Sequence, residues 1–331
     1  IMSSAAIRCC DRIKNQENYP INFFDEMVNT TFDVISDVTF SDDEGFDRVG
    51  VHRAIDSYIA EAGKISLPDI LGFPDWVPRL SRVISGKALK QMKTLADSVI
   101  DRRRDGPSKS PPDLLDLLLA GVDPKTQREM NTGELRDNLL TFIVAGHETT
   151  ALTLSWALYL LANDDRVQEL ARQEVTEKVL SEKVQGRDIV NLKYVRSVID
   201  ETLRLYPPAA LVSRTAAGFD NLCGREIRPG DTVIIPIYAL HRHHTLWRNP
   251  DDFYPERFET DSPQDRYAYL PFGDGPRVCI GANFAINEAV IILSSLLKRF
   301  RFKPVAGLVP SPKMILTLRP EGGVWLMAEP I

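Results

Sequence analysis

Apolar residues recur at spacings of three and four along the first two thirds of the chain, up to about residue 205. This spacing gathers apolar side chains on one face of an α-helix. Prolines separate the segments that carry the pattern, and helices usually end before a proline. We therefore predict a succession of helices over this part of the chain.

One predicted helix differs from the others in its pattern. The segment from Gly133 to Asn163 is apolar on almost every side, apart from an interruption at Gly146-His147-Glu148-Thr149-Thr150. A helix that is apolar all round is typically buried. A carboxylate and two hydroxyls are expensive to bury without partners or a task, so the interruption is a candidate functional feature.

After Pro207 the pattern changes to short β-branched stretches separated by turn residues. Residues 211–215 and 231–237 are predicted strands, and 314–327 is predicted to form a final hairpin around its two adjacent glycines. Residues 251–275 have no usable period and are predicted to form a long loop, a kind of segment that usually serves a site. A last helix is predicted from about Ala282 to Phe300.

These elements predict a mainly α fold with small β-sheets. With 331 residues, of which 44% are hydrophobic, the chain can bury a sizeable core. We expect a single domain over residues 1–331, with a helical part at about 1–205 and a part with the sheets and loops at about 206–331.

Charge and cysteine usage narrow the possible partners. The net charge of −6 and the pI near 5.5 argue against nucleic acid, which needs clustered Lys and Arg. No stretch reaches the roughly 18 apolar residues of a membrane span, so no membrane segment is expected. The four cysteines form no C-x-x-C pair, which favours a reducing compartment, and we expect a cytoplasmic protein.

The chain starts with Ile1, and its opening resembles the middle of a helix. We therefore expect that an N-terminal portion is missing from it, and a membrane anchor in such a portion stays possible.

The segment from Pro271 to Ala282 combines glycines, an arginine and a cysteine at close spacing. Gly273 permits a tight backbone turn, and Arg277 offers a planar fork to a carboxylate. Cys279 stands just before the last predicted helix, whose positive end favours a thiolate. Gly281 is small enough to let a flat ligand approach, so this segment is a candidate cofactor loop.

Two further groups of polar residues are weaker signals by themselves. Glu201 and Arg204 lie three apart on one predicted helix, a spacing that alone indicates an exposed pair. His241, His243 and His244 resemble a metal cluster, but no further ligand stands at a recognisable spacing, and we do not predict a metal there.

The segment from Pro271 to Ala282 resembles the haem-binding loop of the cytochromes P-450, the haem-thiolate monooxygenases. Residues 145–150 look like that family's oxygen-activation motif, and Glu201-Thr202-Leu203-Arg204 matches its E-x-x-R motif. Pro255-Glu256-Arg257-Phe258 supplies the matching second arginine. The resemblance covers nearly the whole chain, but no segment matches the family's early strands, substrate-covering loop or propionate-binding helix. Without these parts the chain is expected to bind haem weakly or not at all and not to turn over.

The resemblance implies a role for each of these residues. Cys279 is the expected axial ligand of the iron in haem b (iron protoporphyrin IX). Glu148 and Thr149 are the expected acid-alcohol pair that manages protons, while Glu201, Arg204 and Arg257 form a structural charge cluster. Further haem-binding residues are expected to be Arg277, Phe272, Gly273, Arg214 and Gly281, with Arg214 and Arg277 on the propionates. By analogy, the substrate-facing residues are Ala145, Ala209, Leu211, Val212, Ile315 and Leu316.

The implied function is an oxidoreductase that inserts one atom of O2 into a hydrophobic small molecule, with electrons from NAD(P)H. The chain has no flavin or iron–sulfur motif, so the donor is expected to be an external reductase or a protein of the ferredoxin or flavodoxin type. Two alternatives stay open. A peroxygenase or haem-thiolate isomerase would share the cysteine loop without needing Glu148 and Thr149, and a haem-binding or defective fragment would have no activity.

Overall fold

The computed structural model describes residues 1–16, 18–40, 50–51, 53–55, 57, 80–106, 111–260 and 265–331. Within them the chain forms two compact units. Unit 1 comprises Ile1–Ala5 and Val28–Ala151, and unit 2 comprises Ala6–Met27 and Leu152–Ile331. The single domain over residues 1–331 stays a prediction.

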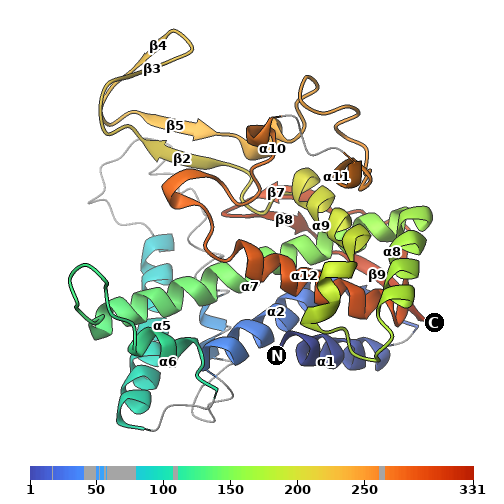
Figure 1. Ribbon diagram of the computed structural model, residues 1–331, viewed down its shortest axis with the longest axis horizontal. Helices are drawn as coiled ribbons and strands as arrows, with labels where there is room; N and C mark the ends of the chain where they lie inside the picture. Colours follow the sequence, from blue (N-terminus) through green and yellow to red (C-terminus); the bar gives the residue numbers. More distant parts are fainter. Residues whose placement is uncertain are drawn as a thin grey trace. The chain divides into compact units, whose positions relative to one another are not determined.

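Unit 1 is helical in its described residues (Figure 1). It holds α5 (Leu80–Asp105), α6 (Leu114–Leu119), most of α2 (Phe23–Phe40) and the first part of α7 (Thr132–Asn163). The apolar faces of these helices form one core, which bears out the helical spacing of the sequence. This core contains Phe32, Ile35, Phe40, Val51, Ala54, Ile55, Met92, Ala96, Val99, Ile100, Leu115, Leu135, Leu139, Leu140 and Ile143.

A buried ion cluster fixes α6 against the end of α5. Asp113 is the N-cap of α6, and its carboxylate accepts the N–H of Asp116 at 3.0 Å. Arg103 donates to both carboxylates at 2.8 Å, and all three side chains are at most 5% exposed. The cluster therefore ties the two helices together across the segment that joins them.

Unit 2 contains the other helices and all the paired strands of the described residues. Its helices are most of α1 (Met2–Lys14), the end of α7, α8 (Asp165–Lys178), η1 (Gly186–Asn191), α9 (Lys193–Leu205), α10 (Ile237–Leu240), α11 (Arg257–Thr260), η2 (Arg266–Ala268), η3 (Gly275–Arg277) and α12 (Ala282–Leu297). The strands are β1 (Ile21–Asn22), β2 (Val212–Thr215), β3 (Asp220–Leu222), β4 (Arg225–Ile227), β5 (Thr232–Ile235), β6 (Phe300–Pro304), β7 (Ser311–Met314), β8 (Leu318–Glu321) and β9 (Trp325–Pro330).

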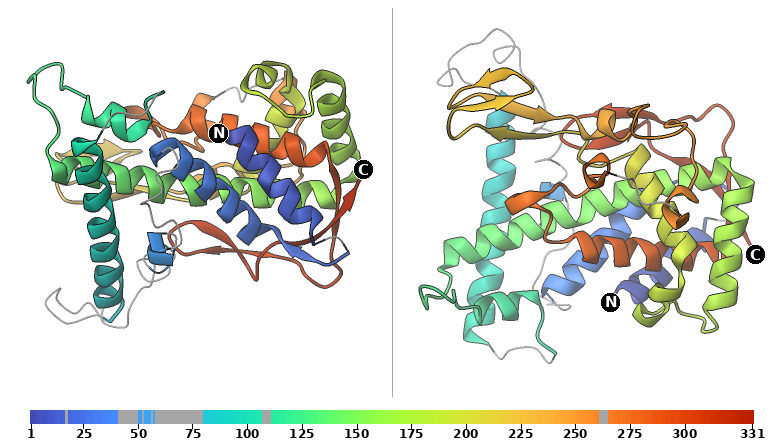
Figure 2. Two further views of the ribbon diagram at one scale, coloured as in Figure 1. Left: turned by 90° about the horizontal axis from the view of Figure 1, so that it is seen from below. Right: turned by 45° about the horizontal axis from the view of Figure 1, so that its top comes forward.

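The described residues of unit 2 form four small antiparallel sheets. The largest has the order β1-β9-β6, and the C-terminal strands of the chain are drawn in red in both views of Figure 2. The others are β2-β5, β3-β4 and β7-β8. The expected fold class, mainly α with small sheets, is confirmed, and strands β2 and β5 lie where two strands were predicted.

The final hairpin was predicted wrongly. The structure pairs β8 with β7 across a turn at residues 315–317, while β9 leaves this hairpin and pairs with β1 and β6. Gly322 and Gly323 both have positive φ, as expected of a bend, but the chain that follows the bend joins another sheet.

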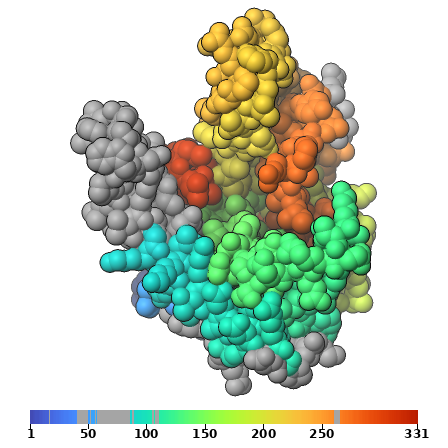
Figure 3. Space-filling view, turned by 90° about the vertical axis from the view of Figure 1, so that its left-hand side faces the viewer, coloured from blue at the N-terminus to red at the C-terminus, as the bar shows by residue number. Residues whose placement is uncertain are grey.

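The hairpin of β3 and β4 was not predicted. Its two-residue turn consists of Cys223 (φ 51°) and Gly224 (φ 83°), the two positive φ values of a type I′ turn. Figure 3 shows this hairpin, in yellow, protruding from the rest of unit 2.

The segment predicted as a long loop, residues 251–275, contains the short helices α11 and η2, and its residues 261–264 lie outside the described part. Residues 41–49 and 58–79 of the predicted helical part also lie outside the described part. In the described residues, no helix combines the length and apolar character that crossing a membrane requires.

Candidate haem site

The candidate cofactor loop, from Pro271 to Ala282, is held by its own backbone and by that of Leu270 directly before it. Gly273 donates to the carbonyl of Leu270 at 3.1 Å, and Cys279 donates to the carbonyl of Phe272 at 3.0 Å. Gly273 and Gly275 have φ of 70° and 75°, values that residues with a Cβ rarely adopt. An added Cβ at either glycine would meet nothing within 4 Å, so the requirement is conformational and not steric.

The outer face of this loop is apolar and open. The Cys279 thiol is exposed, and its neighbours Val278 and Ile280 are 52% and 87% exposed. Gly281 is the N-cap of α12, a 16-residue helix, so Cys279 stands two residues before the cap of that helix. These features fit a flat apolar cofactor bound through sulfur.

The surrounding residues do not fit a metal held by protein side chains alone. No group of three His, Cys, Asp or Glu residues capable of holding a metal occurs in the described part of the chain. Arg214 and Arg277 are both exposed and take part in no ion pair among the described residues, so both guanidinium groups are available to the propionates of a haem.

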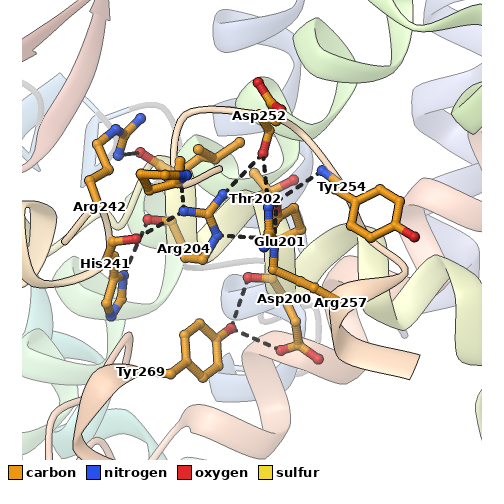
Figure 4. A network of polar contacts seen from close by, with 12 residues as sticks. Asp200, Glu201, Thr202, Arg204, His241, Arg242, Asp252, Tyr254, Arg257 and Tyr269 are labelled. Atoms are coloured by element: carbon orange, nitrogen blue, oxygen red, sulfur yellow. Dashed lines mark hydrogen bonds and ion pairs between the residues drawn. The ribbon is translucent and has the colours of Figure 1, made fainter. Parts of the chain in front are cut away.

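Glu201, Arg204 and Arg257 form the expected charge cluster (Figure 4). The Glu201 carboxylate accepts from Arg204 at 2.7 and 2.8 Å and from Arg257 at 3.0 Å. The side chains of Glu201 and Arg204 are both 0% exposed, whereas that of Arg257 is 12% exposed. Glu201 also accepts the backbone N–H of Tyr254 at 2.9 Å, so one carboxylate orders the segment before α11.

Arg204 extends this cluster along the backbone. Its guanidinium donates to the carbonyls of His241, Pro250 and Asp252 at 2.9, 2.6 and 3.1 Å. A planar group with five donors suits three backbone carbonyls and a carboxylate in one plane. The cluster thereby joins α9 to the backbone of residues 241–254.

Three residues of this network were not predicted as site residues. Tyr269 donates to the carboxylate of Asp200 at 3.1 Å and to its carbonyl at 2.9 Å. Burial raises the pKa of Asp200, and it raises that of Tyr269 well above its usual value. His241 is 0% exposed, and burial lowers its pKa to about 4. The only sequence signal was the histidine triplet, which resembled a metal site.

The predicted acid-alcohol pair lies in unit 1, on α7. Glu148 is 3% exposed, and Thr149 donates its hydroxyl to the carbonyl of Ala145 at 2.8 Å. The helix α7 continues without a break through this segment. Only the apolar pattern of the side chains is interrupted here. Hydroxyls that donate to carbonyls of the preceding turn leave the helical backbone in place.

The neighbours of this pair are structural. His147 donates from Nδ1 to the carbonyl of Ile143 at 2.9 Å, and its ring meets that of Phe32 edge to face. An added Cβ at Gly146 would lie 3.2 Å from Cδ1 of Ile35, so this glycine allows close approach to α2.

The candidate substrate-facing residues fall into two groups. Leu211 and Leu316 of unit 2 are 45% and 50% exposed, and Ala209 is exposed too. The N–H of Leu318 donates to the carbonyl of Pro208 at 3.0 Å, which brings the β7-β8 turn next to the segment before β2. Ile315 and Val212, both half-buried, lie in the same two segments, whereas Ala145 is an exposed residue of unit 1.

Comparison with protein families gives one match, to the model described as cytochrome P-450, over residues 1–327. Among individual relatives, the bifunctional cytochrome P-450/NADPH–P-450 reductase 2 of Bacillus subtilis is 35% identical over 310 residues. The match covers 92% of the chain and 29% of that protein.

Two other relatives come from different kinds of organism. Cyclooctatin synthase of Streptomyces melanosporofaciens is 32% identical over 91% of the chain and 66% of its own length. Cytokinin hydroxylase of Arabidopsis thaliana is 34% identical over 97% of the chain and 64% of its own length. The chain thus spans less than two thirds of the length of these relatives.

Proposed function

Because the chain belongs to the cytochrome P-450 family, we propose that it is a haem-thiolate monooxygenase acting on a hydrophobic organic substrate. The observation that carries the proposal is the exposed Cys279 thiol, held on an open apolar loop at the N-terminus of α12. Haem b bound through that thiolate supplies the chemistry, reductive activation of O2 with cleavage of its O–O bond.

The chain's own residues bind and orient this cofactor. Cys279 would provide the sulfur ligand. The guanidinium groups of Arg277 and Arg214 would hold the propionates, and the turn through Phe272 and Gly273 would support the loop that carries Cys279.

Glu148 and Thr149 are proposed to supply protons. A hydroxyl can pass a proton on because it both donates and accepts, and a protonated carboxyl group can supply the next one. In the structure the Thr149 hydroxyl donates to Ala145, so this bond must break when the hydroxyl turns to a new acceptor. This role is what separates the monooxygenase from a peroxygenase or isomerase, which need no such protons.

The substrate is proposed to be apolar, because the candidate substrate-facing residues carry no charge. These residues are Ala145, Ala209, Leu211, Val212, Ile315 and Leu316. We propose electrons from NAD(P)H through a separate reductase or a ferredoxin- or flavodoxin-type donor. A cytoplasmic location is part of the proposal, supported by four free cysteines, as in reducing compartments.

A pair of cysteine variants tests the proposal. We expect Cys279→Ser to abolish the red-shifted Soret band of the reduced carbonyl complex, because only a thiolate donates enough charge to the iron. Cys223→Ser is the matched control, since Cys223 is also exposed but lies at the β3-β4 turn. Haem should also protect Cys279, and not Cys223, from alkylation by iodoacetamide. A thiolate-type band in Cys279→Ser, or equal protection of both cysteines, would rule out the proposed ligand.

A further inference from the structure

His241 is a buried residue for which the proposed function gives no role. It is the C-cap of α10 and 0% exposed, while its neighbours His243 and His244 are exposed. It belongs to no metal-binding group of the described residues. Its two ring nitrogens therefore need another explanation.

Nδ1 of His241 lies 3.2 Å from the carbonyl of Arg204, in the last turn of α9. A helix would normally give this carbonyl the N–H of the residue four positions later, but that residue is Pro208, which has no N–H. His241 thus replaces the missing donor. Arg242 donates to a second carbonyl at this helix end, that of Leu205.

Nε2 of His241 accepts the backbone N–H of Leu270 at 2.9 Å. Nδ1 must donate to a carbonyl and Nε2 must accept from an N–H, and only the neutral Nδ1–H tautomer satisfies both. A second ring proton would place two N–H groups face to face inside the protein.

Leu270 directly precedes the candidate cofactor loop, Pro271 to Ala282, which is called the cysteine loop from here on. Its carbonyl accepts from Gly273, and the carbonyl of Phe272 accepts from Cys279. A short series of hydrogen bonds therefore leads from the end of α9 through the His241 ring to the backbone of Cys279. The ring of Tyr269 covers that of His241, with centroids 5.3 Å apart, and shields this connection from water.

We propose that His241 is a positioning residue for the cysteine loop: its unprotonated Nε2 fixes Leu270, and with it the backbone that carries Cys279, to the end of α9. The contact holds whether or not haem binds, and only the meaning of Cys279 as a ligand rests on the proposed function.

The charges around the ring favour its neutral form. Burial is the main reason for the low pKa of His241, and the cations of Arg204 and Arg242 lower it further. On α9 the carboxylates of Glu201 and Asp200 are already paired with arginines, and Tyr269 is the titratable group on the loop side.

Two amide variants separate the two ring nitrogens. In His241→Gln the side-chain oxygen can reach the position of Nε2, whereas in His241→Asn the shorter amide replaces only Nδ1. His244→Gln is the control at an exposed neighbouring histidine. The measurement is hydrogen–deuterium exchange of the Leu270 and Cys279 amides in the haem-free chain, with the carbonyl spectrum after haem addition as a second readout.

We expect His241→Asn to speed exchange at Leu270 by about 10-fold or more, and His241→Gln to stay within about 3-fold of the parent, because a buried N–H without an acceptor is costly. After haem addition, His241→Asn should lose more of the thiolate-type band than His241→Gln. Parent-like exchange in both variants, or equally fast exchange in both, would overturn the proposal. If the variants differ in exchange as expected but the parent chain shows no thiolate-type band, the proposed function is wrong and the role of His241 stands.

If His241→Asn does not fold, the proposal can still be tested on the parent chain. Protection at Leu270, relative to the Thr202 amide within α9 and corrected for the intrinsic rate, should fall as the pH is lowered from 7 to 4. A ratio that stays constant over this range would overturn the proposal.

Discussion

The side chain of Arg204 has no access to solvent, so its charge depends entirely on protein partners. Its guanidinium meets the Glu201 carboxylate and three backbone carbonyls, and both ionic side chains are 0% exposed. Removing one member of such a pair leaves a buried charge uncompensated, which costs far more than the pair contributes to stability.

We expect Arg204→Met to lower the free energy of unfolding by about 3–5 kcal/mol. The control is Arg228→Met, whose ion pair with Glu226 has both side chains more than 60% exposed, and which should change stability by less than about 1 kcal/mol. Urea unfolding followed by circular dichroism measures both. Equal losses in the two variants would show that burial does not set the strength of the cluster.

At the residue scale, the spacing of Glu201 and Arg204 alone indicated no more than an exposed pair. The buried cluster with Arg257 was predicted from the resemblance to the family's motifs, which connect residues far apart in the sequence. His241 could not be found in this way. Its role depends on Pro208 lacking an N–H and on Leu270 lying within reach, and the first is visible in the sequence while the second is not.

The helix α6 shows how one residue can serve two purposes. Asp113 caps the helix by accepting the N–H of Asp116 and also pairs with the buried Arg103. An Asn at this position can keep the cap but not the charge, whereas an Ala can keep neither.

We therefore expect Asp113→Asn to cost about 1.5–3 kcal/mol, the value of a hydrogen bond to a charged group. Asp113→Ala should cost about 1 kcal/mol more, because the cap is lost as well. Thermal unfolding of both variants, with hydrogen exchange at the α6 amides, measures the difference. Identical stability of the two variants would mean that the cap contributes nothing here.

The positions of helices and strands were predicted better than the pairing between strands. The apolar pattern located α7, α12, β2 and β5, since each depends on local periodicity. It did not locate the pairing of β9, because an alternating strand fits any neighbour with a complementary face, and β1 lies some 300 residues away in the sequence. The β3-β4 hairpin was not predicted because its turn is Cys-Gly and its strands are short and polar.

For the whole molecule, acid should weaken the fold chiefly through the buried histidine. The pKa of His241 is about 4 in the folded chain and about 6.5 in an unfolded one. The unfolded chain therefore takes up a proton first, so this contribution is complete above about pH 6.5 and is lost as the pH falls towards 4. Asp200 acts in the opposite direction, since its pKa is raised and protonation favours the folded form.

We expect the free energy of unfolding to fall between pH 7 and pH 4 by up to about 3 kcal/mol from this histidine. The decrease should be smaller in His241→Gln, which has no group to protonate at this position. Urea unfolding at several pH values tests this. A pH dependence that is unchanged in the variant would assign the acid sensitivity to other groups.

The open face of the cysteine loop also links the chain to the supply of its cofactor. Val278 and Ile280 are exposed, and any ligand that binds only the folded chain stabilises it by mass action, by about 2.7 kcal/mol at a free concentration a hundred times Kd. If haem is that ligand, the melting temperature must rise with haem concentration. In a cell, the amount of folded protein would then follow how much haem is being made, and a shortage of haem would leave chaperones and proteases with more of this chain to process.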